Sequence, residues 1–370
     1  MKTLTAEIAA SFCKDPRLKL REYEALDLDA ARILSTHKDR IQLNGLTSLS
    51  LAAAEELAKH SGTLSLRSLA TLPDDVAEAL AKHEGDLLLE GLTQLPDVLA
   101  PKLAQNAEYI ELDQLAEISD GAAAVLAASR AELSLRGLKR LSTSAAELLA
   151  QRTDTLRLTG LKELSPGVAH ALAQHRGILN LRGVTDLSPE AAVGLAGHRG
   201  FLNLRGLMEL AAETAKALAP HKGMLDLSGP SGLSDDAAAA LGRNRGTLFL
   251  NGVTHLSDAA TAGLAQHQGT LGLEGLITLS DDAVEVLSKH QGLLLVHGLD
   301  IATANKMTSE TDAAALAKGR RLMEKANDQF ERGALTEEEL LLKVMEIWPP
   351  PSYGPFRGFK AFEPTSERPS

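Results

Sequence analysis

The sequence predicts an α/β fold in which a short parallel strand and a short helix alternate along the chain as a right-handed solenoid. Three observations predict it: an uninterrupted repeat of 23 residues, a strand-like and then a helix-like apolar pattern inside each repeat, and apolar positions filled mainly by leucine and alanine. The parallel sheet is expected on the concave face and the helices on the convex face, because a helix is wider than a strand. A helical hairpin is expected after the array.

The repeat is found by stepping 23 residues at a time from Leu18, which reaches leucine or isoleucine at every step up to Leu294. Twelve complete repeats follow the consensus L-x-L-x-G-L-x-x-L-S-x-x-A-A-x-x-L-A-x-H-x-G-x, and we number its positions 1 to 23. One such unit cannot bury its apolar face alone, whereas stacked units bury a continuous core. The array is therefore expected to span residues 18–302 with thirteen strands.

Each repeat carries the signals of its own elements. Positions 1 and 3 are apolar around a polar position, which is the period of a strand, and position 5 is Gly in ten of thirteen repeats, where the chain must turn. Ser at position 10 reads as a helix N-cap, with Ser165-Pro166 as an example. Ala, Ala, Leu and Ala at positions 13, 14, 17 and 18 form a helical stripe, and Gly at position 22 is expected to stop the helix.

These motifs resemble the leucine-rich repeat family, in particular its helix-bearing ribonuclease-inhibitor-like and cysteine-containing-like classes and the 23-residue repeats of bacterial type. The present repeat is shorter and has Gly where those classes often have Asn or Cys. The resemblance covers about three quarters of the chain. The resemblance implies a non-enzymatic binding scaffold, because members of this family use one type of surface to bind many unrelated partners.

Composition and motifs exclude several other classes. The formal net charge of −11 argues against a nucleic-acid binder, and the single cysteine, Cys13, excludes a disulfide framework. No run of about 18 apolar residues and no signal peptide is found, so a cytoplasmic protein without membrane contact is expected, with a translocated effector as the alternative. No phosphate loop, metal motif or nucleophile motif occurs, so neither enzymatic activity nor a cofactor is expected.

Position 20 is His in eight of twelve repeats, which could suggest a metal site. We favour a structural role, because a residue copied with the repeat serves something that each repeat needs. The position follows the helix, where a hydrogen-bond donor can satisfy backbone carbonyls. The histidines are His37, His60, His83, His175, His198, His221, His267 and His290.

Positions 2 and 4 vary between repeats and are expected to face the concave surface, where a protein partner would bind. An acidic, partly apolar area precedes a basic one, and Phe249 is expected to be an exposed aromatic on the same face. The alternative is that Asp113 and Arg136 pair across neighbouring strands on a solvated face. The candidate residues are Leu88, Glu90, Glu111, Asp113, Arg136, Arg157, Arg182, Arg205 and Phe249.

The two ends differ from the array. Residues 1–17 are expected to contain a capping helix, and residues 303–348 to form a helical hairpin, with apolar residues at helical spacing in 309–331 and again from Leu340 to Trp348. Residues 322–348 weakly resemble the SHOCT module, which implies oligomerisation, so a homo-oligomer through the hairpin is one alternative and a simple seal of the last repeat the other. The tail 349–370, expected to be disordered, carries a docking motif or a strap of Tyr353, Phe356, Phe359 and Phe362.

Two functional hypotheses follow from the sequence. The first is a protein-interaction scaffold that binds its partner, of unknown identity, on the concave face. The alternative is a regulator, inhibitor or sensor of an enzyme or foreign factor that uses the C-terminal hairpin and tail. Truncation at Pro349 separates them, because only the second hypothesis loses its partner.

Overall fold

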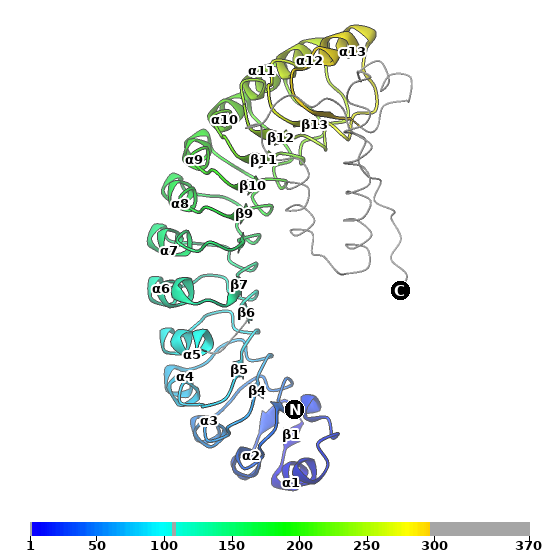
Figure 1. Ribbon diagram of the computed structural model, residues 1–370. Coiled ribbons are helices and arrows are strands. Elements are labelled where there is room, and N and C mark those ends of the chain that lie inside the picture. The colour runs from blue at the N-terminus through cyan, green and yellow to red at the C-terminus, as the bar shows by residue number, and fades with distance from the viewer. Residues whose placement is uncertain (1, 106–108, 297–370) are drawn as a thin grey trace. The chain divides into compact units, whose positions relative to one another are not determined.

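The computed structural model describes residues 2–105 and 109–296, which fall into two units that divide between Lys162 and Glu163. Each unit is a run of strand–helix repeats with the helices on one side of the strands (Figure 1). The expected hairpin (303–348) and tail (349–370) lie outside the described residues.

The first unit opens with a cap and continues with short strands and helices. Its elements are β1 (Thr3–Leu4), α1 (Ala6–Lys14), a 3-10 turn (Leu20–Glu22), β2 (Ala25–Leu26), α2 (Leu28–Ser35), β3 (Ile41–Gln42), α3 (Leu51–Leu57), β4 (Leu64–Ser65), α4 (Asp74–Leu80), β5 (Leu87–Leu88), a 3-10 turn (Asp97–Leu99), α5 (Ala100–Ala104), β6 (Tyr109–Glu111), α6 (Asp120–Ala128), β7 (Glu132–Ser134), α7 (Thr143–Leu149) and β8 (Leu156–Arg157).

The second unit is more regular. Its described elements are α8 (Pro166–Leu172), β9 (Ile178–Asn180), α9 (Pro189–Leu195), β10 (Phe201–Asn203), α10 (Ala212–Leu218), β11 (Met224–Asp226), α11 (Asp235–Leu241), β12 (Thr247–Phe249), α12 (Asp258–Leu264), β13 (Leu271–Gly272), α13 (Asp281–Ser288) and β14 (Leu294–Leu295).

The described strands pair in parallel as β1–β2, β3 to β5 and β6 to β8 in the first unit and as β9 to β14 in the second, and all pairs except β1–β2 keep the 23-residue register. Leu202 of β10 lies opposite Leu179 of β9 and Leu225 of β11, so the register partner of each residue is its counterpart in the next repeat. The leucines at positions 1 and 3 from Leu64 onward are almost entirely buried between the sheet and the helices. The predicted parallel α/β repeat is thereby confirmed.

Serine caps the helices and also links them. Ser188 Oγ accepts from the amide of Ala191 at 3.2 Å, as expected for an N-cap. Ser257 Oγ in addition donates to Asp235 Oδ1 of the preceding repeat at 2.5 Å. One residue type therefore begins a helix and joins it to its neighbour.

Glycine at position 5 is required by close stacking of backbones. A Cβ at Gly206 would lie 2.5 Å from the carbonyl oxygen of Val184, in the same turn of the preceding repeat. The prediction that Gly at position 22 stops the helix is wrong, since α9 ends at Leu195 and Gly200 comes five residues later. A Cβ at Gly200 would instead collide with the carbonyl oxygen of Gly177, so this glycine also serves stacking.

The first repeat departs from the pattern. A strand was expected at Leu18, but Leu18 is 40% exposed and Leu20–Glu22 is a 3-10 turn, so this part of the thirteen-strand prediction is wrong. Glu22 occupies the position of the stacking glycine in this repeat. The chain instead pairs β1 with β2, beside the α1 helix that the sequence predicts as a cap.

Replacement of Gly206 by Ala is expected to lower the free energy of unfolding by about 1–3 kcal/mol, because the added methyl group overlaps the Val184 carbonyl oxygen. Urea titration of the full chain measures this change. Gly232→Ala is the matched control, since nothing lies within 4 Å of its Cβ position. Equal effects of the two substitutions would contradict the stacking explanation.

Candidate functional site

The sheet side that points away from the helices is formed by positions 23, 2 and 4 of each repeat, and we call it the strand face. Positions 2 and 4 were expected there. Position 23, which was not, belongs to it because side chains alternate along a strand, so Tyr109 and Glu111 lie on one side of β6 and the buried Ile110 on the other.

The strand face of the first unit is largely polar and open to solvent. Glu111 and Arg136 are exposed, whereas Leu88 and Glu90 are half-buried. Tyr109, a residue that the sequence reasoning missed, is 44% exposed and lies opposite Glu132 in the register of β6 and β7. It is therefore an open aromatic side chain among charged neighbours.

Arginines of this unit meet carboxylates that lie on or directly after the preceding strand. Asp113 accepts from the Arg136 amide at 2.9 Å and from Ser134 Oγ at 2.6 Å, and its second oxygen lies 3.9 Å from Arg136 Nε. Arg157 Nη1 donates to Glu132 Oε1 at 2.7 Å. The cross-strand pairing that the sequence left as the alternative is therefore present, although Arg136 stays exposed.

Glu90 is paired within the same unit. It lies 2.8 Å from Arg67 Nη2 of the preceding repeat, so Arg67 is a further residue of this surface. The acidic area expected from Glu90 and Asp113 is thus an area of ion pairs.

In the second unit, asparagines at position 2 hold the backbone of the strand face. Asn180 Oδ1 accepts from the amide of Arg182 at 3.3 Å, and Asn203 Oδ1 from that of Arg205 at 3.1 Å. Arg205 Nε also lies 2.9 Å from Oδ2 of the buried Asp226. The backbone amides of two of the predicted arginines, Arg182 and Arg205, are therefore held by asparagine side chains.

Phe249 is buried, contrary to the prediction that it is an exposed aromatic. Only 7% of it is exposed, and a Cβ at Gly272 would lie 2.6 Å from its ring, so the ring lies over the neighbouring strand where no side chain stands. It belongs to an apolar cluster on the strand face, which we call the face cluster: Ile178, Phe201, Met224, Phe249, Leu293 and Leu295. Most of its members occupy position 23.

Glu274 is a further residue that sequence reasoning missed. Burial raises the pKa of its carboxyl group to about 7, a shift that Arg205 opposes and Asp226 reinforces. Its amide donates to Asn251 Oδ1 at 3.3 Å. The only sequence signal for Glu274 is that an acidic residue stands at position 4 of a late repeat.

The histidines of position 20 stack as a ladder. The rings of His175 and His198 are 6.2 Å apart, and those of His198 and His221 are 5.9 Å apart and nearly parallel. Nε2 of His83 donates to the Gly62 carbonyl at 3.0 Å, which belongs to the preceding repeat. The histidine therefore has the structural role that we favoured from the sequence: it donates to a backbone carbonyl, and the neighbouring repeat supplies that carbonyl.

Burial lowers the pKa of five of these imidazoles, those of His60, His83, His198, His221 and His267. It lowers the pKa of His198 to about 3, with smaller contributions from the neighbouring His221 and His175, and that of His267 to about 4. Among the described residues, no group of three or more histidine, cysteine or acidic side chains is arranged to hold a metal ion.

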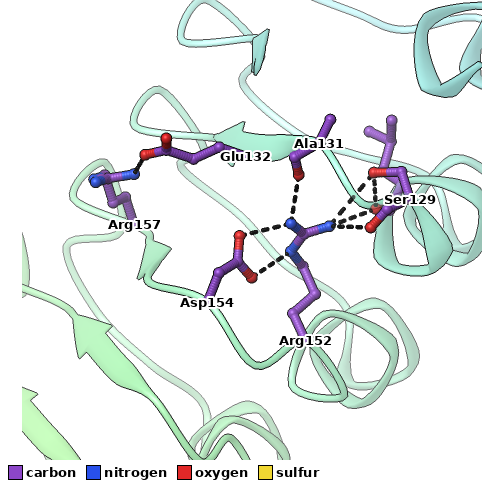
Figure 2. Close-up of polar contacts among 7 residues, drawn as sticks. Ser129, Ala131, Glu132, Arg152, Asp154 and Arg157 are labelled. Atoms are coloured by element: carbon purple, nitrogen blue, oxygen red, sulfur yellow. Dashed lines mark hydrogen bonds and ion pairs between the residues drawn. The ribbon is translucent and has the colours of Figure 1, made fainter. Parts of the chain in front are cut away.

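Arg152 takes the place of histidine where the ladder is interrupted. Its guanidinium donates to the carbonyls of Leu126 at 2.9 Å and Ala131 at 2.6 Å, and pairs with Asp154 at 2.6 Å (Figure 2). It also donates to the Ser129 carbonyl at 3.2 Å. Arg152 thus joins its own repeat to the preceding one.

The expected tail motif, Tyr353, Phe356, Phe359 and Phe362, lies outside the described residues. In the part of the chain that the structure describes, no helix has the length and apolar character needed to cross a membrane.

The chain was compared with family models, curated proteins and solved structures. No family model and no curated protein matches the chain. A leucine-rich-repeat protein of Leptospira interrogans is 17% identical over 83% of this chain and 97% of that chain, with a TM-score of 0.36. The Drosophila Toll–Spätzle complex matches at 14% identity over 80% of this chain and 50% of that chain, with a TM-score of 0.36.

Neither comparison carries an argument about fold or function at these values. The architecture is shown by the chain itself, through buried leucines in register, parallel strands one repeat apart and one helix per repeat. Each of the two units is an array of stacked strand–helix repeats.

The histidine ladder predicts a loss of stability in acid. In the unfolded chain the imidazole of residue 198 is protonated below pH about 6.5, whereas in the folded chain His198 is protonated only below about pH 3. The contribution of neutral His198 to the free energy of unfolding is therefore complete above about pH 7. It declines by about 1.4 kcal/mol per pH unit as the pH falls from about 6.5 to about 3. His198→Gln is expected to make the fall in the free energy of unfolding shallower between pH 7 and 4.5, measured by urea titration. The exposed His255→Gln is the control, and identical slopes for His198→Gln and the parent chain would contradict the explanation.

Arg152→Met is expected to lower the free energy of unfolding by about 3 kcal/mol, because it leaves Asp154 and two buried carbonyls without their partner. The same substitution at Arg140, whose ion pair with Glu117 is exposed, serves as the control and is expected to change little. Thermal unfolding monitored by circular dichroism compares the two. A midpoint for Arg152→Met as high as that for Arg140→Met would argue against the role of Arg152.

Proposed function

We propose that the chain is a non-enzymatic interaction scaffold and that the strand face of the first unit binds a protein partner. The exposure of Tyr109 on β6 is the observation on which this proposal depends most. Tyrosine combines a large apolar ring with a polar tip and is enriched among the residues that contribute most to protein–protein binding.

The surroundings of Tyr109 support a protein ligand. Glu111, Glu132 and Arg136 are exposed on the same face, and Leu88 of the preceding strand, β5, is half-buried. An aromatic side chain within a rim of both charge signs is typical of protein interfaces. The charged rim would select the partner and its orientation more than it would raise the affinity.

The burial of Phe249 narrows the surface that the sequence predicts. Tyr109 of the first unit is an aromatic side chain of the strand face that a partner could contact, whereas Phe249 and Phe201 are buried. Leu88, Glu90, Glu111, Asp113, Arg136 and Arg157 are therefore retained as candidate contacts in the first unit.

The test uses the full chain as bait in affinity capture from its native cell, followed by measurement of the dissociation constant of the captured protein. Tyr109→Ala is expected to weaken binding at least about tenfold, and Arg136→Glu to slow association. Val193→Ala, which shortens an exposed apolar side chain on helix α9, is the matched control and is expected to bind as the parent does. A dissociation constant unchanged by both Tyr109→Ala and Arg136→Glu would remove this surface from the proposal.

A further inference from the structure

Position 23 changes character along the chain. In the first unit it is polar or exposed, as in Thr63, Asp86, Tyr109 and Glu132, but from Ile178 onward it is buried in every repeat. The buried residues at this position are Ile178, Phe201, Met224, Thr247, Thr270 and Leu293. The second unit therefore has an apolar strand face that the first unit lacks.

This face is shielded from solvent. All three residues of β10, β11 and β12 are buried, so these strands are covered on both sides, although helices α9 to α13 all lie on one side (Figure 1). The six residues of the face cluster are each 1–7% exposed. Two phenylalanines alone account for about 300–500 Å² of apolar surface, which a soluble chain rarely leaves open in one patch.

The shield also covers polar groups at the edge of the cluster. Asn203 and Asp226 at position 2 are buried, and Glu274 at position 4 is desolvated enough for its pKa to reach about 7. The cover therefore reaches from position 23 to position 2 of these strands, whereas position 4 is half-buried at Glu274 and exposed at Arg205.

We propose that the face cluster binds the chain's own C-terminal segment, residues 309–348, as an intramolecular cover. The last described residue, Val296, comes directly after Leu293 and Leu295 of the cluster. Residues 297–308 can span about 40 Å when extended, so the segment can reach any part of the cluster.

The dimensions of the segment suit the face. The interval from β9 to β14 corresponds to five strand spacings, or about 24 Å, and a helix over residues 309–331 would be about 34 Å long. The segment carries apolar residues at helical spacing, among them Leu316, Met323, Leu340, Val344 and Trp348. Such a stripe is stable in water only when it is buried.

Methionine oxidation tests the proposal in the full chain, because the array contains its own reference. Met208 is 66% exposed and Met224 of the cluster only 3%. With hydrogen peroxide and peptide mass spectrometry, Met224 is expected to oxidise at least about tenfold more slowly than Met208. Leu340→Asp combined with Val344→Asp is expected to bring the two rates close together, whereas the control Lys343→Asp is expected to leave them apart.

Three results would overturn the proposal. One is a Met224 that stays protected in the double variant while the circular dichroism spectrum is unchanged, and another is a Met224 that reacts as fast as Met208 in the parent chain. A protection that appears only at concentrations where the chain associates would assign the cover to a second chain.

A second readout avoids changes in the segment itself. Trp348 is the only tryptophan of the chain, so its quenching by acrylamide reports on the segment alone. Phe249→Ser is expected to raise the quenching constant several-fold, and Val193→Ser on helix α9 to leave it unchanged. A Trp348 that is as accessible in the parent chain as in Phe249→Ser would also overturn the proposal.

Discussion

The whole structure depends on contact between neighbouring repeats, which bury one another's leucines. Leu179, Leu202 and Leu225 meet in register across parallel strands, and the turns between them approach so closely that only glycine fits at positions such as Gly206. A single strand of two or three residues and a helix of seven have no core of their own. Stability in this chain is therefore a property of interfaces between repeats, as in other one-dimensional arrays.

The polar residues of the repeat solve a second problem that stacking creates. Each turn that follows a helix presents buried carbonyls, and position 20 supplies a donor to them from the next repeat. His83 does so with Nε2, Asn244 donates to the carbonyls of Ala219 and His221, and Arg152 reaches three carbonyls at once. Different residue types thus perform one task, and the strands β6, β7 and β8 stay paired where Arg152 replaces histidine. The cost is acid sensitivity, since a buried imidazole cannot be protonated without losing its surroundings.

Much of the fold could be predicted from sequence because the evidence is repeated twelve times. The period, the parallel strands, the serine caps and the role of the histidines all follow from residues that recur at one position. The candidate site could be predicted only in part, because its contacts join different repeats and differ from one repeat to the next. The pairs Asp113–Arg136 and Glu132–Arg157 depend on side-chain geometry across strands. Position 23 was overlooked as a face position, and with it Tyr109 and Phe201, although its change from polar to apolar residues is visible in the sequence. Phe249 was expected in solvent because nothing in its own repeat indicates the empty place above Gly272.

The two units therefore use one scaffold in two ways: a polar strand face with an open aromatic in the first, and a shielded apolar strand face in the second. Both descriptions depend on the claim that a repeat acquires its structure from its neighbours. The most direct measurement is the circular dichroism of a peptide of residues 179–201, one full repeat, compared with the full chain over a temperature ramp. The account predicts an unfolded spectrum with no cooperative transition for the peptide and a cooperative transition for the chain. A peptide that folds alone and melts cooperatively would contradict it.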